Sequence, residues 1–188
     1  MRRNIVLAGI GVALISVLTL AITTDASGKG SLDISKRLQI ERACEKQVYT
    51  FLKFFEGEHA KTADLFAEDG SVPFPMGKIT VGREAIREFF STIDARNVEL
   101  NVLLANNLLI TVVDENYATG FCYVTHLQHL YADSKHEGQA VLREPNTVTA
   151  WFWEFKRVKG EWKIGKLDVD LVLLNERFIE ASSDEPGS

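Results

Sequence analysis

Three polar residues have side chains suited to acid–base chemistry on a bound molecule: Glu56, Asn106 and His126. An unperturbed imidazole titrates near neutral pH, so His126 could remove a proton from a carbon next to a carbonyl group. The Asn106 amide could donate a hydrogen bond to that carbonyl oxygen and stabilise the developing enolate. Glu56 could orient or protonate a partner. This set predicts a lyase or isomerase that acts on a small apolar carbonyl compound without a cofactor.

Each of these residues also has a simpler interpretation. His126 could be a partly exposed residue near a strand end, and Asn106 could mark a bulge where its amide bonds to its own backbone. Glu56 could be a solvated glutamate, although a negative charge is unfavourable near a helix C-terminus. The alternative function is therefore a non-catalytic module that binds a small ligand or forms dimers.

The first half of the chain predicts the helices that position these residues. Asp33 is a good N-cap, and a helix is expected from Ile34 to about Glu56. Its apolar stripe consists of Cys44, Val48, Phe51, Leu52 and Phe55. A shorter helix at about 59–66, closing at Glu68-Asp69-Gly70, a short strand at 71–74 and a third helix at 83–95 follow. The inner face of the third helix is expected to carry Ala85, Ile86, Phe89 and Phe90.

The second half predicts long strands, which makes an α+β order. The expected strands are 98–113, with an irregularity near Asn106-Asn107, then 117–131, 147–158 and 162–174, with a loop at 132–146. Alternation places Ala118, Gly120 and Cys122 toward the helices, where small side chains would leave room for a cavity.

The same alternation bears on the histidines. His126 shares the side of that small-residue row, whereas His129 points the other way. Ligands on one strand must be an even number of residues apart to share a face. The sequence therefore argues against a metal site built from His126, His129 and His136, and we expect no metal.

Two aromatic rows on these strands could form a pocket wall or a face buried against a second subunit: Trp151, Trp153 and Phe155, and Tyr117, Phe121 and Tyr123. A half-exposed row of this size would be a large apolar patch. Burial against a second subunit is thus expected for at least one row.

Composition limits the partners. The chain has 188 residues, enough for one domain with a core, and its net charge is −5. Such a balance gives no electrostatic footprint for nucleic acid. Cys44 and Cys122 could pair in an exported protein, but their apolar surroundings favour two buried free thiols.

The N-terminus has the pattern of an export segment. Arg2 and Arg3 precede an apolar run from Ile5 to Ile22, and small residues surround Ala26. This predicts a signal peptide over 1–26, with an uncleaved membrane anchor as the alternative, since 18 residues just suffice to span a bilayer. Both place the domain outside the cytoplasm, periplasmic or secreted. The expected organisation is a linker over 27–32, a domain over 33–178 and a disordered tail over 179–188.

Several segments resemble one known family. These are 55–58, 64–70 and 81–90 in the helical half, and 107–110, 117–120 and 160–164 in the strand half. In order and spacing they resemble SnoaL-like domains of the nuclear transport factor 2-like superfamily. The resemblance implies a cone-shaped α+β barrel, with three N-terminal helices packed on a strongly curved, mainly antiparallel sheet around an apolar small-molecule pocket. It also implies a homodimer formed through the sheet face.

Catalytic residues of the superfamily carry over poorly. The general-base aspartate of ketosteroid isomerase falls at Phe74, and its oxyanion-hole tyrosine falls near Thr50. The resemblance to SnoaL-like dehydratases places their tyrosine, aspartate, histidine and further polar residue at Phe51, Glu56, Asn106 and His126. The acid is kept and a histidine is present at the fourth place, so the site is either rearranged or inactive.

The expected pocket lies between the first helix and the strands. Phe51, Phe74 and Phe90 should form its apolar wall, and Cys122 should line it from the second long strand. A concave, mostly apolar site with few polar groups is the usual makeup of a small-molecule pocket. Its polar groups would be Glu56, Asn106 and His126.

Overall fold

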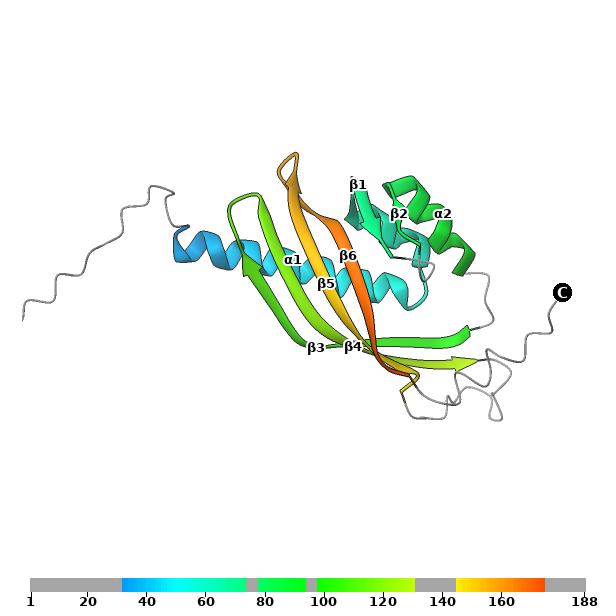
Figure 1. The fold of residues 1–188 in the computed structure, drawn as a ribbon. Coiled ribbons are helices and arrows are strands. Elements are labelled where there is room, and N and C mark those ends of the chain that lie inside the picture. Colours follow the sequence, from blue (N-terminus) through cyan, green and yellow to red (C-terminus); the bar gives the residue numbers. More distant parts are fainter. Residues whose placement is uncertain (1–31, 74–77, 94–97, 131–144, 175–188) are drawn as a thin grey trace, which may run out of the picture. The chain divides into compact units, whose positions relative to one another are not determined.

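A computed structural model describes residues 32–73, 78–93, 98–130 and 145–174 of the chain (Figure 1). Two α-helices, α1 (Ile34–Phe55) and α2 (Arg83–Ile93), and a 3-10 helix, η1 (His59–Leu65), accompany the strands. The strands are β1 (Phe66–Val72), β2 (Thr80–Val81), β3 (Val98–Val112), β4 (Tyr117–Leu130), β5 (Thr147–Val158) and β6 (Glu161–Leu174). These elements confirm the α+β class.

Helix α1 begins and ends close to the predicted positions. The Asp33 carboxylate accepts a hydrogen bond from the Lys36 backbone amide at 2.8 Å, which satisfies one of the free amides of the first turn. The predicted stripe faces the core: Phe55 is half-buried and the other four residues are buried. This stripe is the surface against which the sheet packs.

The segment after α1 differs from the prediction. Glu68, Asp69 and Gly70 do not close a helix but lie inside β1, which begins at Phe66 and pairs in parallel with β6. Strand β2, which the sequence did not predict, pairs antiparallel with β1. Parallel pairing depends on a partner about a hundred residues away, so local sequence carried no signal for it.

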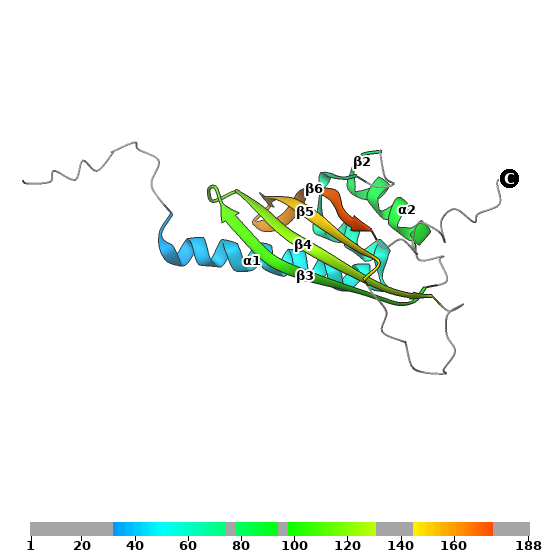
Figure 2. The same cartoon turned by 60° about the horizontal axis from the view of Figure 1, so that its bottom comes forward.

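The six strands form one curved sheet in the order β2-β1-β6-β5-β4-β3 (Figures 1 and 2). All neighbouring strands except β1 and β6 run antiparallel. Helix α1 lies across one side of this sheet, here named the inner face, and the opposite side is the outer face. Helix α2 packs against η1 and β1.

The predicted irregularity in β3 is present. The register between β3 and β4 shifts between Asn106 and Leu109, and Asn107 has a φ of 55°. This left-handed backbone suits asparagine better than most residues. Because of the shift, Asn106 and Leu109 both belong to the outer face although their numbers differ in parity.

The inner face is filled by aromatic side chains. Trp151, Trp153 and Phe155 of β5 are buried, and the Phe51 ring of α1 lies 5.6 Å from Trp151 and 5.4 Å from Trp153 between ring centroids. A Cβ atom added to Gly120 would lie 3.1 Å from the Phe155 ring. The space left by small residues of β4 is thus occupied by its neighbour strand.

Helix α2 confirms most of its predicted inner face. Ile86 and Phe90 are buried and Phe89 is half-buried, but Ala85 is exposed, contrary to the prediction. Cys44 and Cys122 are both buried and unpaired, as predicted. No helix in the described ranges is long and apolar enough to cross a membrane. The predicted export segment, most of the linker and the C-terminal tail lie outside the described residues.

Candidate active site between α1, η1, β3 and β4

His126 lies near the end of β4 with its side chain on the inner face. It pairs with Leu103 of β3 and with Thr147 of β5. The predicted parity is confirmed, since Ala118, Cys122 and Val124 of the same row are buried. Burial lowers the pKa of the His126 imidazole to about 4, and the charge of nearby His59 contributes to this shift. At neutral pH this imidazole is therefore uncharged, but it is a weaker base than the ordinary imidazole expected from the sequence.

Asn101 connects the His126 imidazole to the end of α1. The Asn101 side chain is buried on the inner face of β3, with 6% of its surface exposed. Its Nδ2 atom donates a hydrogen bond to the backbone oxygen of Phe55 at 3.0 Å. Its Oδ1 atom is hydrogen-bonded to Nε2 of His126. A helix end, an edge strand and the neighbouring strand thus meet at one amide group.

Glu56 belongs to the same junction. Its backbone amide caps α1 by bonding to the Leu52 carbonyl at 3.1 Å. Its Oε1 atom accepts a long hydrogen bond of 3.5 Å from the backbone amide of Leu103, the residue paired with His126. Its Oε2 atom forms an ion pair with Lys53 at 3.0 Å. The carboxylate therefore holds the end of α1 to β3.

His59 is a second histidine in this region and is more deeply buried than His126. It begins η1, three residues after Glu56, and only 8% of its surface is exposed. The Phe55 ring packs edge-on against the His59 ring, with 5.1 Å between centroids. Phe55 also contacts Phe90 edge-on at 5.7 Å. The His59 imidazole thus lies against an aromatic ring, and it is near enough to His126 to affect the pKa of that imidazole.

Asn106 does not join this group. Its side chain is exposed on the outer face, where Nδ2 donates to Oγ1 of Thr125 at 3.1 Å and to the backbone oxygen of Leu104 at 3.2 Å. The structure thus brings Glu56 and His126 to one junction and places Asn106 on the other side of the sheet. Its bond to the backbone beside the register shift corresponds to the simpler interpretation of this residue.

The predicted pocket walls lie in the core. Phe51, Phe90 and Cys122 are fully buried, and Phe51 makes edge-on contacts with Phe66 and Phe90 at 6.1 Å each. These rings pack on one another, so they fill much of the predicted cavity. Phe74 lies outside the described residues. No group of three metal-ligating side chains occurs among the residues with described positions.

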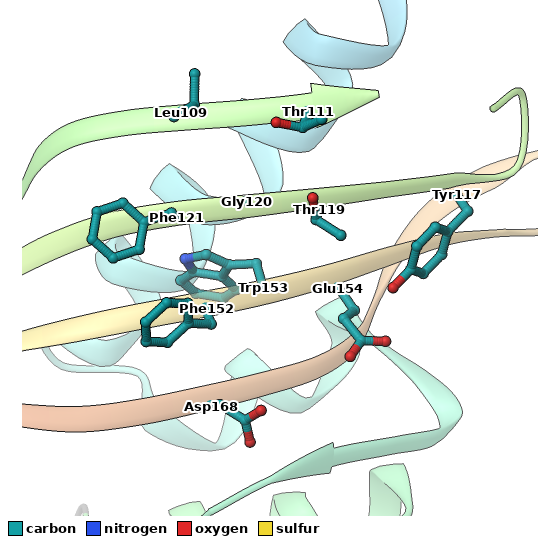
Figure 3. Close-up of a pocket in the computed structure, with 10 residues that line it drawn as sticks. All are labelled: Leu109, Thr111, Tyr117, Thr119, Gly120, Phe121, Phe152, Trp153, Glu154 and Asp168. Carbon is teal, nitrogen blue, oxygen red and sulfur yellow. The ribbon is translucent and has the colours of Figure 1, made fainter. Parts of the chain in front are cut away.

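A concavity of about 310 Å³ lies on the outer face, over the end of β3, the start of β4 and the middle of β5 and β6 (Figure 3). Its apolar end carries Leu109, Phe121 and Phe152, and the two phenylalanine rings lie 5.2 Å apart. Its polar end carries Tyr117, whose pKa is raised by burial and by its hydrogen bond to Glu154. The residues that line it are Leu109, Thr111, Tyr117, Thr119, Gly120, Phe121, Phe152, Trp153, Glu154 and Asp168. They do not include Glu56, Asn106 or His126.

Sequence reasoning missed two residues of the inner junction, Asn101 and His59. Asn101 is a polar residue within a strand of Val and Leu residues, in odd-numbered alternation with Leu103. That position was the available signal, because a buried amide needs partners within reach. His59 follows a helix end immediately, and its burial depends on how α2 and β1 fold over η1.

A curved mixed sheet with α1 across its inner face defines a SnoaL-like α+β protein. The family described as "SnoaL-like domain" matches residues 33–168, so this chain belongs to that family. The family boundary at 33 coincides with the N-cap of α1. No curated protein sequence matches the chain.

Several solved structures share the fold. The putative scytalone dehydratase of Novosphingobium aromaticivorans is 19% identical, with a TM-score of 0.62 over 75% of this chain and 89% of that one. A hexachlorocyclohexane dehydrochlorinase of Novosphingobium barchaimii is 17% identical, with a TM-score of 0.62 over 76% of this chain and 93% of that one. A nuclear transport factor 2-like protein with a cystatin-like fold, from Novosphingobium aromaticivorans, is 16% identical, with a TM-score of 0.57 over 80% and 97%. At these identities the likeness establishes the fold.

Proposed function

We propose that this protein is a lyase or isomerase that removes a proton from a small, apolar carbonyl compound, with His126 as the general base. The observation that carries the proposal is the inner junction. It holds an imidazole that burial keeps uncharged at neutral pH, anchored by the buried amide of Asn101, beside a second histidine and the Phe55 ring. A half-buried imidazole whose pKa is lowered by desolvation is typical of functional sites.

The proposed step moves one proton and one bonding electron pair. His126 takes the proton from the carbon next to the carbonyl group, and the bonding pair forms an enolate. In an elimination, that pair then forms a carbon–carbon double bond, and the proton on the imidazole leaves with the departing hydroxide as water. In an isomerisation, the imidazole returns the proton to another carbon. Both outcomes restore neutral His126. Two fold neighbours bear the names of elimination enzymes, a dehydratase and a dehydrochlorinase.

Glu56 is a supporting residue in this proposal. Its carboxylate bonds to the Leu103 amide and to Lys53, so it fixes the end of α1 against the strand opposite His126. Asn106 has no part in the proposal, because its amide is on the outer face.

The test can begin before the substrate is identified. Native mass spectrometry of protein from its own host identifies retained ligands, and these, with a panel of small ketones, are incubated in deuterated water. The wild type is expected to place deuterium next to the carbonyl group. His126→Gln should slow this exchange at least about 100-fold. Thr125→Val, which alters the adjacent outer-face residue, is the matched control.

A non-catalytic binding module is the second candidate, and one observation favours it. The inner face is packed with rings, and the concavity of about 310 Å³ is on the outer face, away from His126. A retained ligand together with no deuterium incorporation, or with exchange equal in wild type and His126→Gln, would establish this alternative.

We further propose a homodimer through the outer face. Leu109, Tyr123 and Phe152 are 62%, 37% and 43% exposed there, and such an apolar patch is unusual on a monomer unless a partner covers it. Phe152→Asp should convert a dimer to a monomer in analytical ultracentrifugation, whereas Lys159→Asp in the β5–β6 turn should not. A wild-type monomer at high concentration would contradict the pairing.

A further inference from the structure

The amide group of Asn101 has its orientation fixed from one side. Its Nδ2 atom donates to the backbone oxygen of Phe55 at 3.0 Å, and a backbone oxygen can only accept. If the amide were flipped, its own oxygen would face the Phe55 oxygen, and two acceptors would meet in a buried position. Asn101 is only 6% exposed, so water could not relieve that contact. The Oδ1 atom is therefore the atom that faces His126.

This orientation decides which imidazole nitrogen carries the proton. The Oδ1 atom of an amide has no hydrogen to give, so the hydrogen in its bond to the imidazole must be on Nε2 of His126. A neutral imidazole has one N–H group, and its other nitrogen is the acceptor. We propose that Asn101 is a positioning residue that holds neutral His126 as its Nε2-protonated tautomer, so that Nδ1 is the basic atom of the site.

Other described groups lie around the imidazole on α1, η1 and β5. Glu56, at the end of α1, directs Oε1 to the Leu103 amide and Oε2 to Lys53. Burial lowers the pKa of His126, and His59, from η1, adds to this shift. The imidazole is therefore neutral near pH 7.5. Thr147, the β5 residue paired with His126, is uncharged.

The catalytic meaning of this inference rests on the proposed function. Nδ1 would receive the proton from carbon while the Nε2 hydrogen stays bonded to the Asn101 oxygen. The imidazolium formed in that step would keep one N–H in a hydrogen bond to the amide oxygen, which stabilises the new positive charge. Without Asn101 the imidazole would divide between two tautomers, and only part of it would present a base at Nδ1.

The first test reads the tautomer directly and needs no substrate. The full chain is labelled with 15N-histidine, and the His126 signals are assigned by comparison with His126→Gln. Near pH 7.5, Nε2 is expected to show the shift of a protonated nitrogen and Nδ1 that of an unprotonated one. The reverse pattern, or two averaged signals, would overturn the inference.

Variants then separate the effect of the Asn101 amide from a general loss of structure. Asn101→Ala should average the two nitrogen signals. Asn101→Asp keeps an acceptor for Nε2 but loses the donor to the Phe55 oxygen, so it should be less stable. In the folded variant it should keep the wild-type pattern and raise the pKa of His126. Asn106→Ala, which removes an outer-face amide from the same strand, should change neither the nitrogen signals nor the pKa of His126. If Asn101→Ala retained the wild-type pattern in a folded protein, the assignment to Asn101 would be wrong.

Activity adds a third measurement that can fail independently. If a substrate is found, Asn101→Ala should lower kcat about 10-fold with KM nearly unchanged, and Asn101→Asp should restore part of kcat. A confirmed Nε2–H tautomer in a protein without turnover would leave this inference standing and reject the proposed function. Turnover by a protein with the reverse tautomer would reject this inference and leave the proposed function standing.

Discussion

The same strands form both faces of the sheet, but the two faces differ in how their aromatic side chains are covered. On the inner face, Trp151, Trp153 and Phe155 are buried against Phe51 of α1. On the outer face, Phe121 and Phe152 lie at one end of an open concavity (Figure 3). The polar groups differ as well. On the inner face, Asn101 and His126 are largely shielded from solvent, whereas on the outer face Glu154 and Asp168 are accessible to solvent.

This difference shows that aromatic content alone does not locate a ligand site. Both faces are rich in rings, but on the inner face they fill space, and on the outer face they leave it open. What distinguishes the inner face chemically is the half-buried imidazole of His126 and the buried amide of Asn101, because such groups need partners that apolar packing does not supply.

The largest expected difference between the faces is in stability. Phe51→Ala removes a buried ring that contacts rings of α1, β1, α2 and β5, and it should lower the free energy of unfolding by about 3–5 kcal/mol. Phe152→Ala on the outer face should cost the monomer less than about 1 kcal/mol. Urea denaturation followed by circular dichroism, at a protein concentration where the chain is monomeric, measures both. Equal costs in the monomer would mean that the Phe152 ring is packed as tightly as the Phe51 ring.

Lowering the pH should reduce the stability of the folded protein through His126. The folded protein holds its pKa at about 4, whereas the unfolded chain has the ordinary value of 6.5. Between these values the unfolded state binds more protons, so the free energy of unfolding falls as the pH falls, by at most about 3 kcal/mol in total. Urea midpoints measured from pH 7 to pH 4 should show this slope.

The matched variant for that experiment is His126→Gln, which should show a smaller slope over the same pH range. Identical slopes for the two proteins would place the His126 imidazole in contact with solvent and contradict its assignment to the inner junction.

Gly120→Ala tests whether the inner face has spare room. A Cβ atom there would lie 3.0 Å from Cδ1 of Ile110 and 3.1 Å from Cε2 of Phe155, so the substitution should destabilise by about 1–3 kcal/mol. Thr119→Ala, the adjacent outer-face residue, should change stability by about 0.5 kcal/mol or less. A neutral or stabilising Gly120→Ala would show that the small residues of β4 do border a cavity.

The smallest effect concerns the two buried thiols, one on α1 and one on the inner face of β4. Cys44 and Cys122 are fully buried and unpaired, and burial raises the pKa of Cys44 to about 12. A thiol reagent should therefore react slowly with the native protein, and unfolding without reductant should release two reactive groups. Fast labelling of the native protein would mean that the inner face opens readily.

The sequence by itself determined the local elements. The Asp33 cap and the spacing of Cys44, Val48 and Phe51 predicted α1, because a helix and its buried stripe are set by residues within a few turns. The strand at 147–158 was predicted at its observed bounds, and β4 and β6 ended within one residue of prediction at each end. Alternation along β4 correctly placed His126 on the side of Cys122.

Only the tertiary structure decided which polar residues meet. Alternation tells which residues of one strand share a side, but it does not tell which side faces the helix. The resemblance to the dehydratases favoured Asn106, whereas the pairing of β3 with β4 turned Asn101 inward and Asn106 outward. The filling of the expected cavity was decided in the same way. The small residues of β4 predicted an open space beside them. The rings of β5 occupy that space, because neighbouring strands place their side chains on a shared face.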